Sequence, residues 1–452
     1  MDQDLIVLTH VCRGWRNILI SRSSLWTRLD FASIEKIRTY IRRSKSSPLK
    51  FYLGYNGNID DVFPLMIPHI HRLKSLTVNT RALPSILRHF RCHTPLLEKL
   101  DINSVGDPVL DGTLFNGDLS SLRELRLHRV VTQFPWKNLA NLRVVDLNPH
   151  FHRYGTTQIL NFFESAPLLH TVSLRYPMPD YSDAPPGRIV SLRHLNVFTI
   201  NSPPPHSALL HHLHIPTGAS LVSEFCFNGE ESPLLGYLPE RPPNFSNLSH
   251  IITVNLLFNS WRKFVQLSGP SGSLRVLAAW EDWRTFPSHT IDYQILRSLR
   301  RSMLPTVQKL VISKYQYPRP VEAKECPIFP MLSSANNLRT LVLINCNNLP
   351  FVLALDPEQN PSNPVICPNM EELVFYIISW DQFSVKRVAS MAKNRASRGA
   401  KLSSIVFSSL GELAPRKEVS KLREHVTHVV CKFGDAVPAW DDIPGKSGGE
   451  NE

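Results

Sequence analysis

LRTLVLINCNNLP, residues 338–350, carries the clearest copy of the pattern from which the fold can be predicted. Apolar residues stand at places one, four and six of its first six positions, at Leu338, Leu341 and Leu343. In an extended strand successive side chains point to opposite faces, so Leu341 and Leu343 lie on one face. The sequence therefore predicts a strand with one buried face, followed by a turn around Cys346.

The same six-residue pattern recurs along most of the chain. It begins at residues 73, 97, 122, 142, 169 and 192, and again at 274, 307, 338, 370, 402 and 426. Between strands the sequence favours helix, as in TTQILNFFESAP (156–167) with its apolar stripe. One strand and one helix or turn at such irregular spacing resembles the leucine-rich repeat, which implies an α/β fold. The resemblance implies a leucine-rich-repeat solenoid, a curved parallel sheet with outer helices, and a structural role for Cys346.

Composition and cysteine usage limit the class of protein. The 452 residues exceed what one compact core needs, and a hydrophobic content of 42% predicts that the chain folds. The 7 cysteines form no Cys-x-x-Cys pair, which argues against a zinc ribbon or a disulfide framework and favours a reducing compartment, cytoplasmic or nuclear. No apolar run approaches the roughly 18 residues of a membrane span, so we expect neither secretion nor membrane insertion.

The sequence offers no motif for catalysis or metal binding. Phosphate loops, zinc-protease motifs and nucleophile elbows are missing, and His211, His212 and His214 have no nearby acid or cysteine to complete a metal site. We therefore expect no enzyme activity, no metal and no cofactor.

The net charge of +12 raises the question of nucleic-acid binding. The densest basic run, residues 386–401, carries apolar residues at helical spacing, so its charges should lie on a solvated helix face without aromatic stacking partners. We expect a surface helix there and no nucleic-acid partner, although salt-sensitive retention on heparin would favour the nucleic-acid alternative.

The N-terminal stretch LIVLTHVCRGWRNILISRSSLWTRLDF, residues 5–31, is unusually apolar. Its apolar residues are spaced to form an amphipathic helix over residues 4–21, and a short turn carrying Leu25 and Trp26 follows. One interpretation is a cap over the exposed core of the first repeat.

A second interpretation rests on the order Val11-Cys12-Arg13-x-Trp15-Arg16 and then Ser24-Leu25-Trp26, which resembles the second half of an F-box motif. Residues 29–53 resemble the strand, helix and Arg-Ser-x-x-x-Pro-Leu element that follows this motif in many F-box-like repeat proteins. The usual opening helix, with its Leu-Pro and Glu-Ile-Leu elements, is absent. We therefore expect a truncated F-box-like segment over residues 1–54, an irregular repeat array over 55–435 and a flexible acidic tail over 436–452.

This resemblance implies a substrate-recognition subunit of a cullin-type, SCF-like ubiquitin ligase. Its partners would be a Skp-type adaptor within the cullin complex and an unknown target protein. Carried over by position, the adaptor-binding or box-forming residues would be Leu8, Val11, Cys12, Trp15, Leu19, Leu25 and Trp26. The alternative is a protein-binding repeat scaffold with a vestigial box and no ligase role.

Place five of each repeat should face the open side of the sheet. In the first group it is polar, at Thr77, Asp101, Arg126, Asp146, Ser173 and Asn196, and in the second group it is apolar. The expected target-binding strip combines these apolar residues with place seven: Ala278, Trp280, Val311, Val342, Ile344, Val374, Tyr376 and Val406. The strip could be an open interface, a surface covered by the C-terminal tail through Trp440, or a consequence of the preference of valine for strands.

Overall fold

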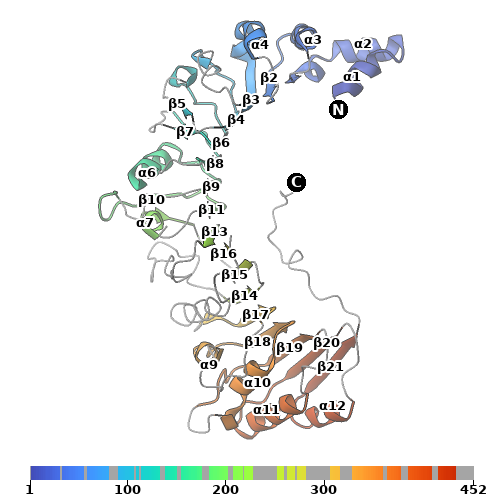
Figure 1. Cartoon of the computed structure of the whole chain (residues 1–452), viewed down its shortest axis with the longest axis vertical. Helices are drawn as coiled ribbons and strands as arrows, with labels where there is room; N and C mark the ends of the chain where they lie inside the picture. The colour runs from blue at the N-terminus through green and yellow to red at the C-terminus, as the bar shows by residue number, and fades with distance from the viewer. Residues whose placement is uncertain are drawn as a thin grey trace. The chain divides into compact units, whose positions relative to one another are not determined.

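The computed structural model describes residues 2–30, 33–54, 59–80, 90–105, 108–110, 114–132, 138–149, 154–175, 183–201, 207–216, 218–227, 252–258, 262–269, 272–280, 306–315, 328–359, 364–377, 385–409 and 416–433. The chain divides into two compact units, Met1–Ala219 and Ser220–Glu452 (Figure 1). The expected tail over 436–452, with Trp440, lies outside the described residues.

The first unit is built on a parallel sheet. Its strands lie side by side in chain order: β1 (Arg28–Asp30), β2 (Leu49–Leu53), β3 (Leu73–Thr80), β4 (Lys99–Ser104), β6 (Glu124–His128), β8 (Val144–Asn148), β9 (Thr171–Arg175) and β11 (Val197–Asn201). Two short parallel pairs accompany it, β5 (Val109–Leu110) with β7 (Val131–Thr132) and β10 (Val190–Ser191) with β12 (Leu213–His214). The segment 1–54 therefore contributes β1 and β2 to the same sheet as the repeats.

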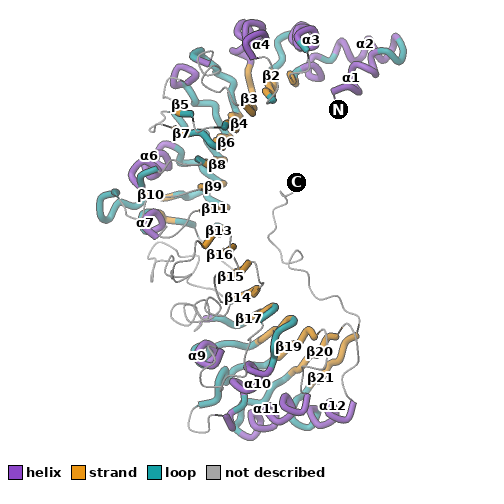
Figure 2. The backbone as a smooth tube through the Cα atoms, viewed as in Figure 1, coloured by secondary structure: helices purple, strands orange, loops and turns teal. Residues whose placement is uncertain are grey.

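Helices precede the first strand of this unit and link the later ones (Figure 2). They are α1 (Asp2–Thr9), α2 (Arg13–Ser21), η1 (Ser23–Trp26), α3 (Ile34–Ser44), α4 (Ile59–Met66), η2 (Ile67–Arg72), η4 (Leu114–Gly117), α6 (Thr156–Ser165) and α7 (Ser207–Leu210). The predicted helix at 156–167 is confirmed as α6, and Ile159, Leu160, Phe162 and Phe163 are its buried stripe. Asp183 supports its first turn, because one carboxylate oxygen accepts a hydrogen bond from the backbone N–H of Thr157 at 2.8 Å.

The second unit is also a mixed α/β arrangement. Its strands are β13 (Ser220–Phe227), β14 (Thr253–Phe258), β15 (Arg262–Gly269), β16 (Gly272–Trp280), β17 (Lys309–Ser313), β18 (Thr340–Ile344), β19 (Glu372–Ile377), β20 (Ser404–Ser409) and β21 (His428–Phe433). Strands β17 to β21 pair in parallel, in chain order. The helical elements α9 (Ile328–Leu332), α10 (Leu349–Leu355), η7 (Pro357–Gln359), α11 (Val385–Ser397) and α12 (Arg416–Leu422) lie along one side of these strands (Figure 1).

The predicted inward places form the core. Places four and six are buried in the following repeats: Leu76 and Val78, Leu100 and Ile102, Leu125 and Leu127, Val145 and Leu147, Val172 and Leu174, Leu310 and Ile312, Leu341 and Leu343, Leu373 and Phe375, Ile405 and Phe407. At about 1.5 to 3 kcal/mol for each large apolar side chain removed from water, these rows are a major source of stability. The expectation of a mixed α/β protein with a large parallel sheet and helices is confirmed.

One repeat was predicted with the wrong start, and another with the wrong neighbour. The sixth repeat begins at Leu195 and not at residue 192, because β11 pairs Phe198 with Val172 and Thr199 with Ser173. Thr199, and not Asn196, therefore continues the place-five row of the first unit.

The repeat expected at residue 274 does not neighbour the one at 307. Strand β15 runs antiparallel to β14 and β16, while β13 pairs with β16 and β14 with β17. Only three residues separate β14 from β15 and two separate β15 from β16, too few for the crossover that parallel neighbours need. Asn255 on β14 consequently stands beside Val311, where Ala278 was expected.

We expect Phe198→Ala to lower the free energy of unfolding by about 3 to 5 kcal/mol, because Phe198 is fully buried and its ring lies 6.3 Å from that of Phe163. Val197→Ala should change it by about 0.5 kcal/mol or less, because Val197 lies on the other side of the strand. Urea unfolding of both variants measures this, and an equal or larger loss for Val197→Ala would restore the register that begins at residue 192.

Candidate functional site

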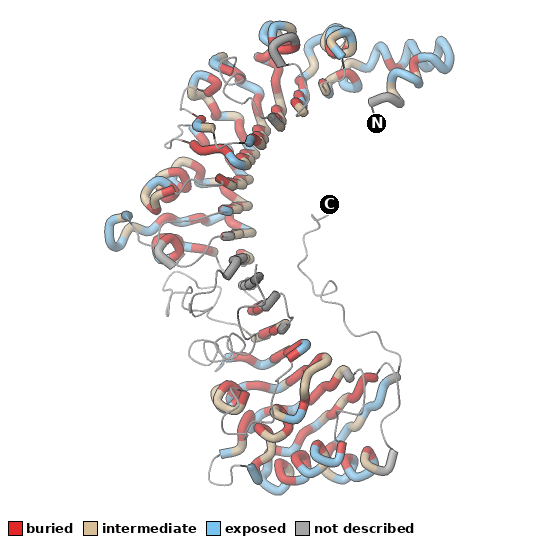
Figure 3. Tube along the Cα trace, in the orientation of Figure 1, coloured by how far each residue is buried: buried red, intermediate tan, exposed pale blue. Residues whose placement is uncertain are grey.

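Exposed apolar side chains are concentrated at the N-terminus of the first unit. Val7 is 62% exposed, Val11 61%, Trp15 51%, Ile18 60% and Leu25 42%. We call these five residues the N-terminal apolar patch. Figure 3 shows most of the backbone around α2 in the colour of exposed residues. Trp15 and Ile18 are three residues apart on α2, so they share one helix face. Exposed apolar side chains that gather on a folded protein usually mark a place where another molecule binds.

The patch is held on a fixed anchor. The indole N–H of the fully buried Trp26 donates a hydrogen bond to the carbonyl oxygen of Leu19 at 2.8 Å, which ties the end of α2 to η1. The ring of Trp26 packs edge-on against Tyr40 at 5.0 Å, and the guanidinium of Arg43 lies 4.3 Å from its centre, so α3 completes the anchor.

The structure divides the expected adaptor-binding residues into two groups. Val11, Cys12, Trp15 and Leu25 are exposed, and Leu8 is half-buried. Leu19 and Trp26 are buried inside the chain and can only shape the segment. Val7 and Ile18 are exposed residues that were missed as site residues, because periodicity alone does not tell which apolar side of a helix stays uncovered.

The single helix expected over residues 4–21 is two helices, α1 and α2. The helix is interrupted between Thr9 and Arg13. The Cys12 thiol caps α2, because it accepts a hydrogen bond from the backbone N–H of Trp15 at 3.5 Å. The side chain of Arg16 donates to the carbonyl oxygen of Thr9 at 2.8 Å, which fixes α1 against α2. The break places both helices in one short hairpin that carries the patch.

A second candidate surface is the open side of the sheet in the first unit. The register aligns one polar row across neighbouring strands: Tyr52, Thr77, Asp101, Arg126, Asp146, Ser173 and Thr199. We call these seven residues the polar row. Tyr52 is exposed and the others are half-buried, so the row is accessible along its length.

Charges of both signs meet around this row. Lys99 lies 2.9 Å from Glu124, and Asp146 lies 3.7 Å from His128 and 3.8 Å from Arg175. The carboxylate of Asp101 has no hydrogen bond or ion pair within the described part of the chain, and burial raises its pKa despite His128, Arg126 and Lys99 nearby. A half-buried carboxylate without a partner can bind a donor from another molecule.

The apolar strip of the second unit is not an open surface. Val311, Val342, Val374 and Ile344 are buried, less than a tenth of each being exposed, and Tyr376 and Val406 are partly buried against them. Of the three interpretations of the strip, the open interface is therefore contradicted at Val311, Val342, Ile344 and Val374. The side chains of Ala278 and Trp280 lie outside the part of the chain that the structure describes.

The basic helix was only partly predicted. Residues 385–397 form α11, and Val385, Val388, Met391 and Ala392 are buried as expected. Arg395 is also completely buried, and its guanidinium donates to the carbonyl oxygens of Ile366 at 2.7 Å and Cys367 at 2.8 Å. That arginine holds the preceding loop and is not part of a solvated basic face.

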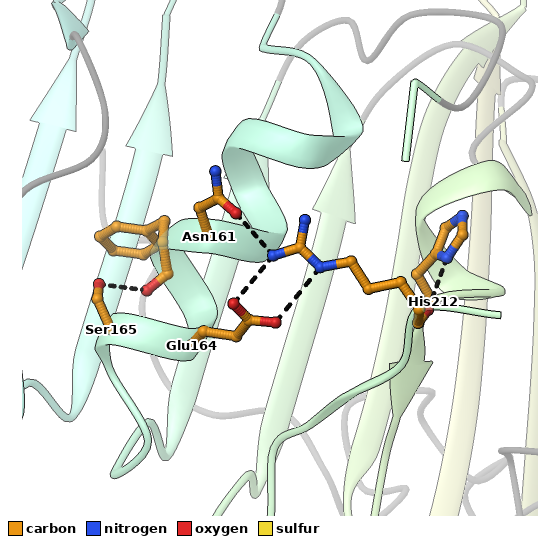
Figure 4. Close-up of polar contacts among 6 residues, drawn as sticks. Asn161, Glu164, Ser165 and His212 are labelled. Atoms are coloured by element: carbon orange, nitrogen blue, oxygen red, sulfur yellow. Dashed lines mark hydrogen bonds and ion pairs between the residues drawn. The ribbon is translucent and has the colours of Figure 1, made fainter. Parts of the chain in front are cut away.

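A polar cluster joins α6 to Arg188, which lies just before the strand β10 (Figure 4). The guanidinium of Arg188 donates to Asn161 at 2.6 Å and to both carboxylate oxygens of Glu164, at 2.9 and 3.3 Å. His212 donates from Nδ1 to the carbonyl oxygen of Arg188 at 2.7 Å. These bonds join α6 to the next repeat and occupy the groups that could otherwise have served a ligand.

The described residues offer no cluster of side chains suited to metal binding or redox chemistry. No three or more histidine, cysteine, aspartate or glutamate side chains gather there as metal ligands, and Cys12, Cys346, Cys367 and Cys431 are not part of a disulfide. Burial raises the pKa of Cys346 to about 12, and its thiol donates to the carbonyl oxygens of Ile312 and Ile344, which suits a structural role in the turn. Among the described helices, none combines the length and apolar character required to cross a membrane.

Comparison with known proteins adds no family. No protein-family model matches the sequence, and no curated protein matches it.

We expect Trp26→Ala to lower the free energy of unfolding by about 3 to 5 kcal/mol, because the substitution empties a fully buried site. Trp15→Ala should leave it nearly unchanged, since the indole of Trp15 is half exposed. Urea unfolding of the two tryptophan variants separates anchor from patch, and a similar loss for both would contradict this division.

The raised pKa of the Asp101 carboxyl predicts that its removal stabilises the fold, by an amount that depends on pH. The folded state binds a proton at this carboxyl more readily than the unfolded chain, so ionised Asp101 lowers stability at neutral pH. We expect Asp101→Asn to raise the Tm at pH 7, on the order of 1 to 2 °C, and the difference to narrow as the pH falls toward about 4.

Asp118 is the matched control with the opposite sign. Hydrogen bonds from the side chain and backbone of Ser120 hold the pKa of Asp118 below its ordinary value, so the ionised form stabilises the fold at neutral pH. Asp118→Asn should lower the Tm at pH 7. Thermal unfolding followed by circular dichroism at several pH values tests the direction of both Tm changes. A lower Tm for Asp101→Asn than for the wild type at pH 7 would contradict the prediction for Asp101.

Proposed function

We propose that this chain is an F-box-like leucine-rich-repeat protein that recruits targets to a cullin-type ubiquitin ligase. In this role the N-terminal helices dock a Skp-type adaptor, and the repeats hold the target while other subunits transfer ubiquitin. The chain itself then needs no catalytic site. The observation that carries the proposal is the N-terminal apolar patch, which is exposed beside a rigid tryptophan anchor.

The energetics of the patch suit a docking surface. The fold is complete without burial of Val7, Val11, Trp15 and Ile18, because Leu19 and Trp26 already anchor the helices. Covering the exposed remainder of each patch residue would contribute on the order of 1 kcal/mol or more. A large aromatic residue such as Trp15 is among the commonest kinds of interface hot spot.

The repeat pattern supports the solenoid part of the proposal. Each clear repeat supplies one strand, neighbouring repeats pair in parallel, and the inward leucine places are buried. These features suit leucine-rich repeats that share a continuous core, in which each unit packs against its neighbours. The reversed strand β15 interrupts the parallel order within the second unit.

The polar row of the first unit is the better candidate for the target-binding surface. The strip of the second unit is buried, whereas the polar row combines accessible side chains with the unpartnered carboxylate of Asp101. Recognition there would depend on hydrogen bonds and charge, which favour specificity over raw affinity.

A protein-binding scaffold without a ligase role is the second candidate. Two positions that match the F-box pattern, Leu19 and Trp26, are buried within the chain itself. Such burial is what a cap over the first strands requires. In that case the N-terminal apolar patch would bind some other partner.

The test is binding of a purified Skp-type adaptor to the full chain, measured by calorimetry. We expect Trp15→Ala to weaken binding about 30-fold or more, the effect of a hot-spot loss of about 2 kcal/mol. Ile18→Ala should weaken it less, and Ile189→Ala is the matched control, because Ile189 is an exposed isoleucine elsewhere in the same unit. Failure of the wild-type chain to bind at micromolar concentration would favour the scaffold candidate.

A further inference from the structure

Four neighbouring members of the polar row have polar atoms whose hydrogen bonds the described chain does not supply. They are Asp101 on β4, Arg126 on β6, Asp146 on β8 and Ser173 on β9. The carboxylate of Asp101 has no partner among the described residues. In the same part of the chain, Nε of Arg126, Oδ1 of Asp146 and Oγ of Ser173 are enclosed atoms without a hydrogen bond. Such atoms are rare in folded proteins, so their concentration in one row suggests that another molecule binds there.

The charges of the row alternate but do not pair with one another. Arg126 stands between Asp101 and Asp146 in the register. Its guanidinium nevertheless lies near the carboxylate of Glu124 instead, at 4.0 Å from Nη2 to Oε2. The two side chains that form ion pairs with Asp146 lie 3.7 and 3.8 Å from its carboxylate, too far for a hydrogen bond. The row therefore offers negative, positive and negative charge in turn to a partner.

A partner with one sign of charge fits this pattern poorly. A basic segment would meet Arg126 between the two carboxylates, and an acidic segment would meet Asp101 and Asp146 on either side of Arg126. Like charges that face one another across an interface destabilise it. Charge complementarity therefore requires a partner whose charges follow the order basic, acidic, basic.

The spacing of the strands determines which kind of segment can present these charges. Neighbouring strands lie about 4.8 Å apart, so Arg126 and Asp146 are displaced from Asp101 by about 4.8 and 9.6 Å along the row. Side chains on one face of an extended segment repeat about every 6.6 Å, which matches neither step. In a polyproline II helix they repeat about every 9.3 Å, which reaches both carboxylates but misses Arg126.

An α-helix matches both steps. Its residues i, i+3 and i+7 share one face, and they rise along the axis by about 4.5 and 10.5 Å from the first. Each of these rises is within about 1 Å of the displacement of Arg126 or Asp146. A helix that lies across the strands can thus place three charges opposite three members of the row.

We propose that the polar row binds an α-helix of the target, with a basic residue at i, an acidic residue at i+3 and a basic residue at i+7. The two basic residues pair with Asp101 and Asp146, and the acidic residue pairs with Arg126. A polar residue at i+10, about 15 Å along the helix, reaches Ser173 on the next strand. This inference rests on the proposal that the polar row is the target-binding surface, and it adds the conformation and charge pattern of the bound segment.

The probe is a fluorescent, alanine-rich helical peptide of about 20 residues, a length at which an isolated helix can form. It carries Lys, Glu and Lys at i, i+3 and i+7, and fluorescence anisotropy measures its binding to the full chain at low salt, where exposed charges are least screened. An isomer with Lys, Lys and Glu at the same positions has the same composition and net charge. A third peptide carries Glu, Lys and Glu, and a fourth is the first peptide with a central proline that breaks the helix.

The Lys-Glu-Lys peptide should bind on the order of tenfold more tightly than its isomer, and the proline peptide should not bind. Asp101→Asn should weaken binding of the Lys-Glu-Lys peptide although it raises the Tm, so this loss cannot come from unfolding. Arg126→Glu should weaken binding too. Arg123→Glu is the matched control and should have no effect, because Arg123 is an exposed arginine just before β6 and outside the polar row.

A triple variant, Asp101→Lys with Arg126→Glu and Asp146→Lys, reverses the charges of the row. It should prefer the Glu-Lys-Glu peptide to the Lys-Glu-Lys peptide. A gain of binding to the reversed peptide cannot come from misfolding, so this result stands by itself.

The proposal is overturned if the Lys-Glu-Lys peptide does not bind, if its isomer binds equally well, or if the triple variant keeps the original preference. Equal binding of the proline peptide would show that the row takes an extended segment, which also overturns it. Binding of the adaptor to the N-terminal apolar patch is measured separately by calorimetry. A failure of the helix proposal and a failure of the proposed ligase role are therefore told apart.

Discussion

The structure depends on one constraint: each strand must bury the apolar residues at places four and six of its repeat. Leu76, Leu125 and Leu341 meet this constraint in different repeats, although the segments that link the repeats vary in length and sequence. A slip of one residue would turn all inward side chains outward, so the leucine spacing fixes the register of the parallel strands. Where the link is too short for a crossover, as before and after β15, the chain keeps its core by reversing a strand.

Residues outside this constraint are where binding can occur. The exposed indole of Trp15 and the unpartnered carboxylate of Asp101 contribute nothing to the inward rows, and Asp101 opposes folding at neutral pH. Trp26, only eleven positions from Trp15, serves the core instead. Stability and recognition are therefore carried by different residues of the same short segments, which allows either to change while the other is kept.

The core was predictable from the sequence because it follows a period, whereas the surfaces were not. Leucine spacing located most strands, but Leu192 and Leu195 both satisfy the pattern, and only strand pairing selects the second. Arg395 was expected in water because its run is basic, yet its carbonyl partners lie 28 and 29 residues earlier in the chain. The order of β14, β15 and β16 and the bonds of Arg188 depend likewise on contacts that no local pattern encodes.

Hydrogen exchange of the full chain, with and without a Skp-type adaptor, tests the central claim that the N-terminal helices are a docking surface on an already folded protein. The account predicts new protection in α1, α2 and η1 alone, and unchanged exchange in the strands from β3 onward, which fold without the adaptor. Protection spread across the strands, or none in residues 5–26, would contradict it.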